Sequence, residues 1–281
     1  MTEYPPCDVL LDILHRLPVK SLIRFRYVSK SWNSLITSPA FINSSLTRSH
    51  SNSNKLIVKY SDVNMGYKLI PEKDNDNNDL SSEQIQELEF LNSFGRNFKL
   101  VGYVNGLFCL CLYEPGRYIV WNPCIRKFIA LPNPSVTDSF AYDLAFGFDS
   151  STNDYKLVRF AFQYKYLSSK KPVVEVYSVN EGSWRITSGG DSYPPWVYIK
   201  DDFLSTAVSL NGAVCFAADW CDGLGSILLS LDFGDEVFRV ISWPNGNFKF
   251  EADIVILVFK GLLSLICHEY MGERCSIINN I

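Results

Sequence analysis

The 281-residue sequence has few of the residues from which active sites are built. It contains only three histidines, His15, His50 and His268, and no two of them have the spacing of metal ligands. It lacks a glycine-rich phosphate loop followed by lysine, and it lacks a Gly-x-Ser-x-Gly nucleophile motif. An enzyme built on this chain would need a metal or carboxylate cluster that the sequence does not offer. We therefore predict no catalytic residue, no metal and no cofactor.

Paired cysteines and long apolar segments are also missing. None of the eight cysteines forms a Cys-x-x-Cys motif, and Cys109 and Cys111 stand inside an apolar run, which indicates small buried residues in a reducing compartment. Residues 1–6 do not resemble a signal peptide. The longest apolar runs, such as 254–259, are too short to span a bilayer. We expect a protein of the cytoplasm, the nucleus or both, with no membrane contact.

The whole chain has no large excess of charge of one sign, but its N-terminal fifty residues and the remainder carry opposite net charges. The net charge of −4 argues against nucleic-acid binding over the entire surface. Residues 1–50 carry six basic and three acidic side chains, a net +3 that leaves −7 for the remainder. The acidic segment 72–87 lacks the glycine and the terminal glutamate of a calcium loop, so we expect it to be solvated.

The first fifty residues have the pattern of several short amphipathic helices. Pro6 suits a first helical turn, and Pro18 is expected to end the first helix at Leu17. Ser29 is the expected N-cap of a later helix. The first helix has one apolar stripe, with Leu11 outside it, made of Val9, Leu10, Ile13, Leu14 and Leu17. Helices this short bury their apolar faces poorly alone, so we expect them to pack on a partner.

Two other interpretations fit helices of this kind. They could form a cap on the domain that follows. They could also be a helix-turn-helix, but their basic residues are spread over two segments and a loop, and the third helix offers mainly serine and asparagine. We therefore predict no nucleic-acid partner.

The string from Leu14 to Trp32, LHRLPVKSLIRFRYVSKSW, closely resembles the F-box of plant F-box proteins. The resemblance covers residues 5–46, with Pro5-Pro6 in place of a usual Leu-Pro and Tyr27 in place of a common cysteine. In that family the F-box docks on a Skp-type linker protein, which a cullin scaffold holds. The resemblance implies that the docking surface is formed or supported by Pro6, Leu10, Ile13, Leu17, Pro18, Leu22, Val28 and Trp32.

After the helices the sequence repeats strand-like segments. Three pairs of residues recur, and the two members of each pair stand seven positions apart on either side of a turn. Successive pairs follow at steps of 56 and 54 residues: Trp121 and Phe128, Tyr177 and Trp184, Leu231 and Phe238. The spacing predicts three hairpins. A period near fifty with four short strands is typical of a propeller blade, although a β-sandwich is an alternative. The next hairpin is expected near residue 285, so the last unit is expected to be incomplete.

Four strings resemble the F-box-associated, kelch-like domain of plant proteins, and the likeness runs from about residue 100 to 265. They are VGYVNGL (101–107), YIVWNP (118–123), FGFDSSTNDYKLV (146–158) and VEVYS (174–178). Cys215-Phe216 departs from a frequent His-Trp pair. The expected fold class is therefore α+β and multi-domain. It comprises a helical F-box at 1–46, a linker at 47–54 and an all-β kelch-like propeller domain at 55–281, incomplete at its C-terminus.

The resemblances imply a substrate-recruiting adaptor subunit of a Skp–cullin–F-box ubiquitin ligase, which binds an unknown target protein through its β domain. The alternative is a truncated F-box protein that docks on the linker without a competent substrate surface and competes with intact adaptors. Propellers bind through loops on one face, and the aromatic residues of the expected loop 191–202 and its surroundings are candidate contacts. These candidates, which could instead pack within a blade, are Tyr193, Trp196, Tyr198 and Trp220.

Overall fold

The computed structural model describes thirteen segments of the chain: 6–49, 55–60, 66–71, 86–87, 98–112, 117–137, 141–162, 171–200, 207–221, 226–241, 252–259, 262–269 and 275–279. The predicted solvated residues 72–85 and the predicted linker residues 50–54 lie outside these segments. The chain divides into two compact units, residues 1–98 with 123–126 and residues 99–122 with 127–281.

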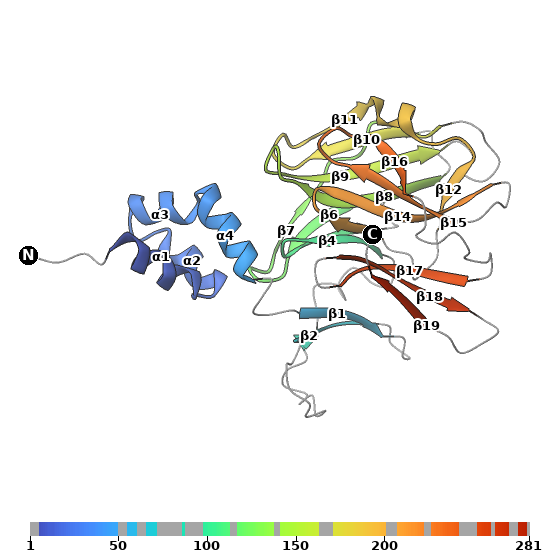
Figure 1. The fold of residues 1–281 in the computed structure, drawn as a ribbon. Helices are drawn as coiled ribbons and strands as arrows, with labels where there is room; N and C mark the ends of the chain where they lie inside the picture. The colour runs from blue at the N-terminus through green and yellow to red at the C-terminus, as the bar shows by residue number, and fades with distance from the viewer. Residues whose placement is uncertain are drawn as a thin grey trace, which may run out of the picture. The chain divides into compact units, whose positions relative to one another are not determined.

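The helical unit contains four helices, drawn in blue in Figure 1: α1 (Cys7–His15), α2 (Val19–Phe25), α3 (Lys30–Ile36) and α4 (Pro39–Ser49). Their shared core consists of Leu14, Ile36 and Phe41, all of them buried. Seven further side chains pack partly against that core: Leu10, Leu11, Leu17, Leu22, Phe25, Trp32 and Leu35. The core is small, so much of each helix faces outward.

Short polar contacts fix where these helices begin and how they meet. The Ser29 side chain accepts a hydrogen bond from the Trp32 backbone N–H at 3.1 Å, which confirms the predicted N-cap of α3. The His15 ring stacks on Phe41 with centroids 4.4 Å apart and bonds to Ser44 and Ser45, which ties α1 to α4. Helix α1 ends at His15, two residues before the predicted end. Helix α4 continues to Ser49, three residues into the range predicted as linker.

The strands form five separate antiparallel sheets in the described segments. β1 (Lys55–Tyr60), β2 (Gly66–Pro71) and β3 (Gln86–Glu87) make the first sheet. The second comprises β4 (Phe98–Val104), β5 (Leu107–Leu112), β6 (Tyr118–Asn122) and β7 (Lys127–Ala130). The third comprises β8 (Ala141–Asp149), β9 (Asp154–Phe162), β10 (Val173–Ser178) and β11 (Ser183–Thr187).

Two sheets follow along the chain (Figure 1). The fourth comprises β12 (Val197–Ile199), β13 (Val208–Leu210), β14 (Ala213–Trp220), β15 (Ser226–Asp232) and β16 (Phe238–Ile241), with β12 and β13 both paired to β14. The last comprises β17 (Ala252–Phe259), β18 (Leu262–Glu269) and β19 (Cys275–Asn279). Within the described segments this architecture is not the two-sheet sandwich considered above.

The three predicted hairpins are confirmed residue by residue. Trp121 lies opposite Phe128, Tyr177 opposite Trp184, and Leu231 opposite Phe238. The same turn position, two residues before the second member of each pair, is left-handed in all three hairpins. It is held by Arg126, Gly182 and Glu236, with φ of 55°, 69° and 58°. The repeat in the sequence therefore corresponds to a repeat of backbone conformation.

Successive sheets of the second unit pack face to face. One face of the third sheet presents Leu144, Phe146 and Leu157 to the second sheet. Residues that alternate with them, including Ala145 and Val158, belong to the cluster shared with the fourth sheet. The fourth sheet in turn shares a small cluster with β17 and β18. The third and fourth sheets are thus covered on both faces, and stacking builds the core, as predicted for propeller blades.

A buried polar clasp joins the third and fourth sheets. The Lys156 ammonium donates to the Phe233 carbonyl at 2.7 Å and lies 2.9 Å from an Asp149 carboxylate oxygen and 3.7 Å from a Glu236 oxygen. Arg185 on β11 also pairs with Glu236. Lys156 and Asp149 are both buried, so each charge depends on the other for stabilisation.

This clasp predicts a specific acid sensitivity. Burial raises the pKa of the Asp149 carboxyl, but hydrogen bonds from Lys156, Ser151 and Thr152 outweigh it and hold the pKa well below its usual range. A carboxyl with a lowered folded-state pKa contributes stability that is present above its unfolded pKa, about 4, and is lost as the pH falls. Asp149→Asn is therefore expected to flatten the fall of Tm between about pH 5 and pH 2.

Thermal unfolding followed at a series of pH values would measure this effect. Asp191→Asn removes an exposed carboxylate of the same unit and should follow the wild-type curve. If Tm fell equally with decreasing pH in wild type and in Asp149→Asn, the Asp149 carboxyl would not stabilise the fold as described.

Candidate functional site

The eight residues predicted to form the docking surface fall into two groups. Pro6, Ile13, Pro18 and Val28 are exposed, with half of the Ile13 side chain (50%) and 64% of Val28 open to solvent. The other four pack partly against the helical core: Leu10, Leu17, Leu22 and Trp32. The first group can contact a partner directly, whereas the second supports the surface from behind.

Three exposed apolar residues of this unit were not among the predicted docking residues. They are Val9 (49% exposed), Val19 (46%) and Tyr27 (88%). Val9 and Ile13 stand four residues apart on α1, so they form one outward apolar stripe with Pro6 at its start. Leu11, which lies outside the predicted apolar stripe, nevertheless packs against the core.

Single exposed apolar side chains are common on proteins, but their density here is high. Val9, Ile13, Val19, Tyr27 and Val28 all lie between residues 9 and 28. Burying one such side chain fully contributes about 1.5–3 kcal/mol. Concentrations of exposed apolar side chains are typical of interaction surfaces.

Tyr193 must be withdrawn from the candidate target contacts in the β domain. It is only 3% exposed, its hydroxyl donates to the Val197 carbonyl at 3.1 Å, and its ring packs edge-on against Phe162 and Phe238. The expected loop 191–202 is partly regular, since a short 3-10 helix (Ser188–Ser192) extends into its start and β12 lies within it. Tyr193 anchors this segment to the core.

The remaining three aromatic candidates differ in exposure. Trp220 is half-buried against the core cluster of the third and fourth sheets, and the Tyr198 hydroxyl donates to Asp219 Oδ2 at 3.2 Å. Trp196 is 55% exposed and has a φ of 62°, a conformation that is rare for a bulky residue. Its carbonyl accepts a hydrogen bond from the Cys221 N–H at 2.7 Å, which holds the strained backbone in place. Of the four, Trp196 offers the most accessible aromatic surface.

The described side chains include no group of three or more His, Cys, Asp or Glu residues that could hold a metal ion. Burial raises the pKa of the Cys109 thiol well above its usual value, and nearby Cys111 raises it further, so this thiol is a poor nucleophile. Both residues are buried, as expected of packing residues. No helix in the described segments has the length and apolarity needed to cross a membrane.

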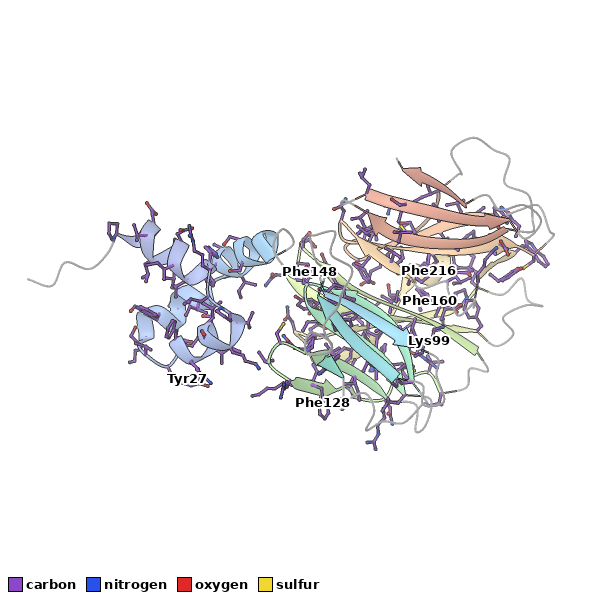
Figure 2. The ribbon with its side chains drawn as sticks, turned by 90° about the horizontal axis from the view of Figure 1, so that it is seen from below. Tyr27, Lys99, Phe128, Phe148, Phe160 and Phe216 are labelled. Carbon is purple, nitrogen blue, oxygen red and sulfur yellow. The ribbon has the colours of Figure 1, made fainter. Side chains whose placement is uncertain are left out.

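A small cavity lies where β4, β8 and the fourth sheet converge. Its lining includes Lys99, Asp143, Lys200 and Phe216, and Figure 2 labels Lys99 and Phe216. The volume of about 20 Å³ accommodates one water molecule and no organic ligand. Lys200 is also engaged with Asp219, 3.2 Å away. The cavity is therefore not a small-molecule site.

Four short helices followed along the chain by stacked antiparallel sheets fit the class of F-box proteins. Residues 6–44 match the F-box domain, and residues 51–273 match the F-box associated beta propeller domain. The chain belongs to the family of proteins with that F-box associated beta propeller domain. The predicted family and fold class are confirmed.

Several curated proteins of Arabidopsis thaliana are similar to this chain. The F-box/kelch-repeat protein At3g23880 is 27% identical over 94% of this chain and 72% of its own length. The F-box protein CPR1 is 29% identical over 94% of this chain and 66% of its own length, and the F-box protein At3g57590 is 27% identical over 96% and 65%. The chain thus spans about two thirds of the length of these relatives.

Similarity to solved structures is weak. TolB from Acinetobacter baumannii aligns over 82% of this chain and 52% of its own, with a TM-score of 0.41 and 7% identity. An endo-arabinase from Bacteroides thetaiotaomicron aligns over 81% and 93%, with a TM-score of 0.36 and 13% identity. Likenesses at this level carry no argument about the function of this chain.

Proposed function

We propose that this chain is a substrate-recruiting adaptor of a Skp–cullin–F-box ubiquitin ligase. Its helical unit docks on a Skp-type linker, which connects it to the cullin scaffold, and its β domain binds a target protein. The adaptor itself makes and breaks no covalent bond. It acts by raising the effective concentration of the target near the enzyme that transfers ubiquitin. We expect it to act in the cytoplasm, the nucleus or both.

The exposed apolar stripe of α1 is the observation that supports docking most strongly. Val9 and Ile13 are each about half exposed, although a helix of this small unit could have used them in its core. Leu14 fills the core and Leu10 packs against it, so α1 has apolar residues on two sides. A helix with a second apolar face fits insertion into a groove of another protein.

The target side of the proposal rests on Trp196. An exposed tryptophan whose backbone conformation is fixed loses little conformational freedom on binding. Tryptophan is also among the residues that most often dominate binding energy. Tyr198, two residues further along, is half-buried and oriented by Asp219, so it is the second candidate contact.

If Trp196 contacts the target, Trp196→Ala is expected to lower capture of the target about tenfold or more. Proximity labelling should use the full chain carrying Ile13→Asp, so that captured targets are not destroyed. Adding Trp196→Ala to this chain should deplete a defined set of labelled proteins.

Ile186→Ala is the matched control, because Ile186 is exposed on β11 (60%) but has no part in the proposed contact. In the chain without Ile13→Asp, Trp196→Ala should leave linker binding unchanged. If the labelled set were the same with and without Trp196, this residue would not be a target contact.

A further inference from the structure

The helical unit carries a concentration of positive charge that its own acidic residues do not balance. Residues 6–49 contain six lysines and arginines and only two aspartates, and no acidic residue occurs from Ile13 to Ser49. Asp12 pairs with Arg16 at 2.7 Å. In the described segments, no ion pair involves the four remaining basic residues between 17 and 30, which are Lys20, Arg24, Arg26 and Lys30.

These four side chains are all exposed, as are two apolar residues that neighbour them in the sequence. Lys20 and Arg24 stand four residues apart on α2, so they share one face. Arg26 and Lys30 flank Tyr27 and Val28 at the turn between α2 and α3. Figure 2 shows Tyr27 at the edge of the helical unit. We call the set Lys20, Arg24, Arg26, Tyr27, Val28 and Lys30 the basic corner.

The basic corner has a fixed backbone. The N–H groups of Arg26, Tyr27 and Val28 donate to carbonyls of α2 at 3.0–3.1 Å. Behind the turn, Phe25 and Trp32 meet edge to face with ring centroids 5.3 Å apart, which leaves Tyr27 and Val28 on the outside. Arg26 is also oriented, because its Nε donates to Asn33 Oδ1 at 3.0 Å. The charges are therefore presented by a preorganised frame.

Like charges four residues apart on a helix repel each other and destabilise it slightly. Lys20 and Arg24 impose this cost with no internal carboxylate to offset it. Cations beside exposed apolar side chains are complementary to a partner surface that has both carboxylates and apolar side chains. Nucleic acid fits less well, because the whole chain has a net charge of −4.

We propose that the basic corner contacts an acidic surface of the Skp-type linker and accelerates formation of the complex. This inference rests on the proposed docking function and specifies the chemistry of the partner. Charges at the edge of an interface act mainly on the association rate, which makes that rate the quantity to measure.

The test uses the full chain and the purified linker, with association followed at about 50 mM and about 500 mM NaCl, where charges are weakly and strongly screened. The variant Arg24→Gln/Lys30→Gln removes two corner charges and spares the Arg26 contact to Asn33. The control Arg117→Gln/Lys127→Gln removes two exposed charges from the β domain. At the lower salt concentration the corner variant should associate about tenfold more slowly than wild type and control. At the higher concentration all three should converge.

Poly-L-glutamate serves as a second probe and should slow wild-type association at low salt more than that of the corner variant. Equal association rates and equal salt dependence for wild type and corner variant would overturn the inference while leaving docking intact. Retention of wild type, but not of the variant, on duplex DNA at physiological salt would assign the corner to nucleic acid and also overturn it. If wild type failed to bind the linker at either salt concentration, the docking function would be wrong and the inference would fall with it.

Discussion

Ile13→Asp is expected to abolish co-purification of the full chain with a Skp-type linker. Half of the Ile13 side chain is exposed, and it shares the outer stripe of α1 with Val9. Docking would bury this position, so the new carboxylate would have to lose its hydration without a partner. A penalty of about 3 kcal/mol or more weakens binding at least about a hundredfold. Titration of the linker against wild type and variant measures the difference directly.

The matched control is Ile186→Asp, which places the same charge at an exposed isoleucine of β11 (60% exposed). It should bind the linker as wild type does. Leu17→Asp and Leu22→Asp, which the sequence alone suggests as tests, are less informative because both leucines pack against the helical core. A folded Ile13→Asp variant that retained wild-type affinity would remove the α1 stripe from the docking surface.

The docking surface could be predicted from the sequence only in part. The helical spacing placed Val9, Leu10, Ile13, Leu14 and Leu17 on one stripe, but a stripe of that width has an inner and an outer half. Which half faces the core depends on where α3 and α4 pack, and that is decided by Ile36 and Phe41. The sequence therefore predicts the helix, but it leaves Leu11 outside the stripe although Leu11 packs against the core.

Strand register was the most predictable part of the fold. Tyr177 and Trp184 stand seven residues apart on either side of a turn, and in the structure they lie opposite each other across the hairpin. The corresponding pairs of the other two hairpins have the same separation and the same pairing. The repeat in the sequence predicts these cross-strand pairs because the length of a hairpin turn determines the register of its two strands.

The segment around Tyr193 was not predictable in the same way. Pro194, Pro195 and three aromatic residues indicated a loop, yet Tyr193 fills a gap in the core between Phe162 and Phe238. Such burial depends on side chains from β9 and β16, which are distant in sequence. An aromatic residue in a turn-rich segment is equally suited to a core and to a surface, and only the tertiary contacts distinguish the two.

The largest stability effect is expected for Gly147→Ala, at the contact between the third and fourth sheets. A Cβ at Gly147 would lie 2.0 Å from one ring carbon of Phe233 and 2.4 Å from another. Phe233 is only 1% exposed, so its ring cannot move aside into solvent. Overpacking of this severity is expected to lower the free energy of unfolding of the β domain by about 3 kcal/mol or more.

A double mutant shows whether that loss comes from this contact. Phe233→Leu replaces the ring by a shorter side chain and should cost about 1–2 kcal/mol by itself, but it makes room for the methyl group that Gly147→Ala adds. The double mutant should therefore be more stable than the sum of the two single effects predicts, by about 1 kcal/mol or more in urea unfolding. Gly234→Ala is the control, since a Cβ added at Gly234 would lie no closer than 3.2 Å to another atom, a side-chain oxygen of Asp232.

The same variants separate the two units functionally. The helical core contains only residues 10–41, so Gly147→Ala should leave linker binding unchanged while it weakens target capture. Additive effects of Gly147→Ala and Phe233→Leu would show that the glycine is not required for the packing of the two sheets. A parallel loss of linker binding would show that the helical unit depends on the β domain for its stability.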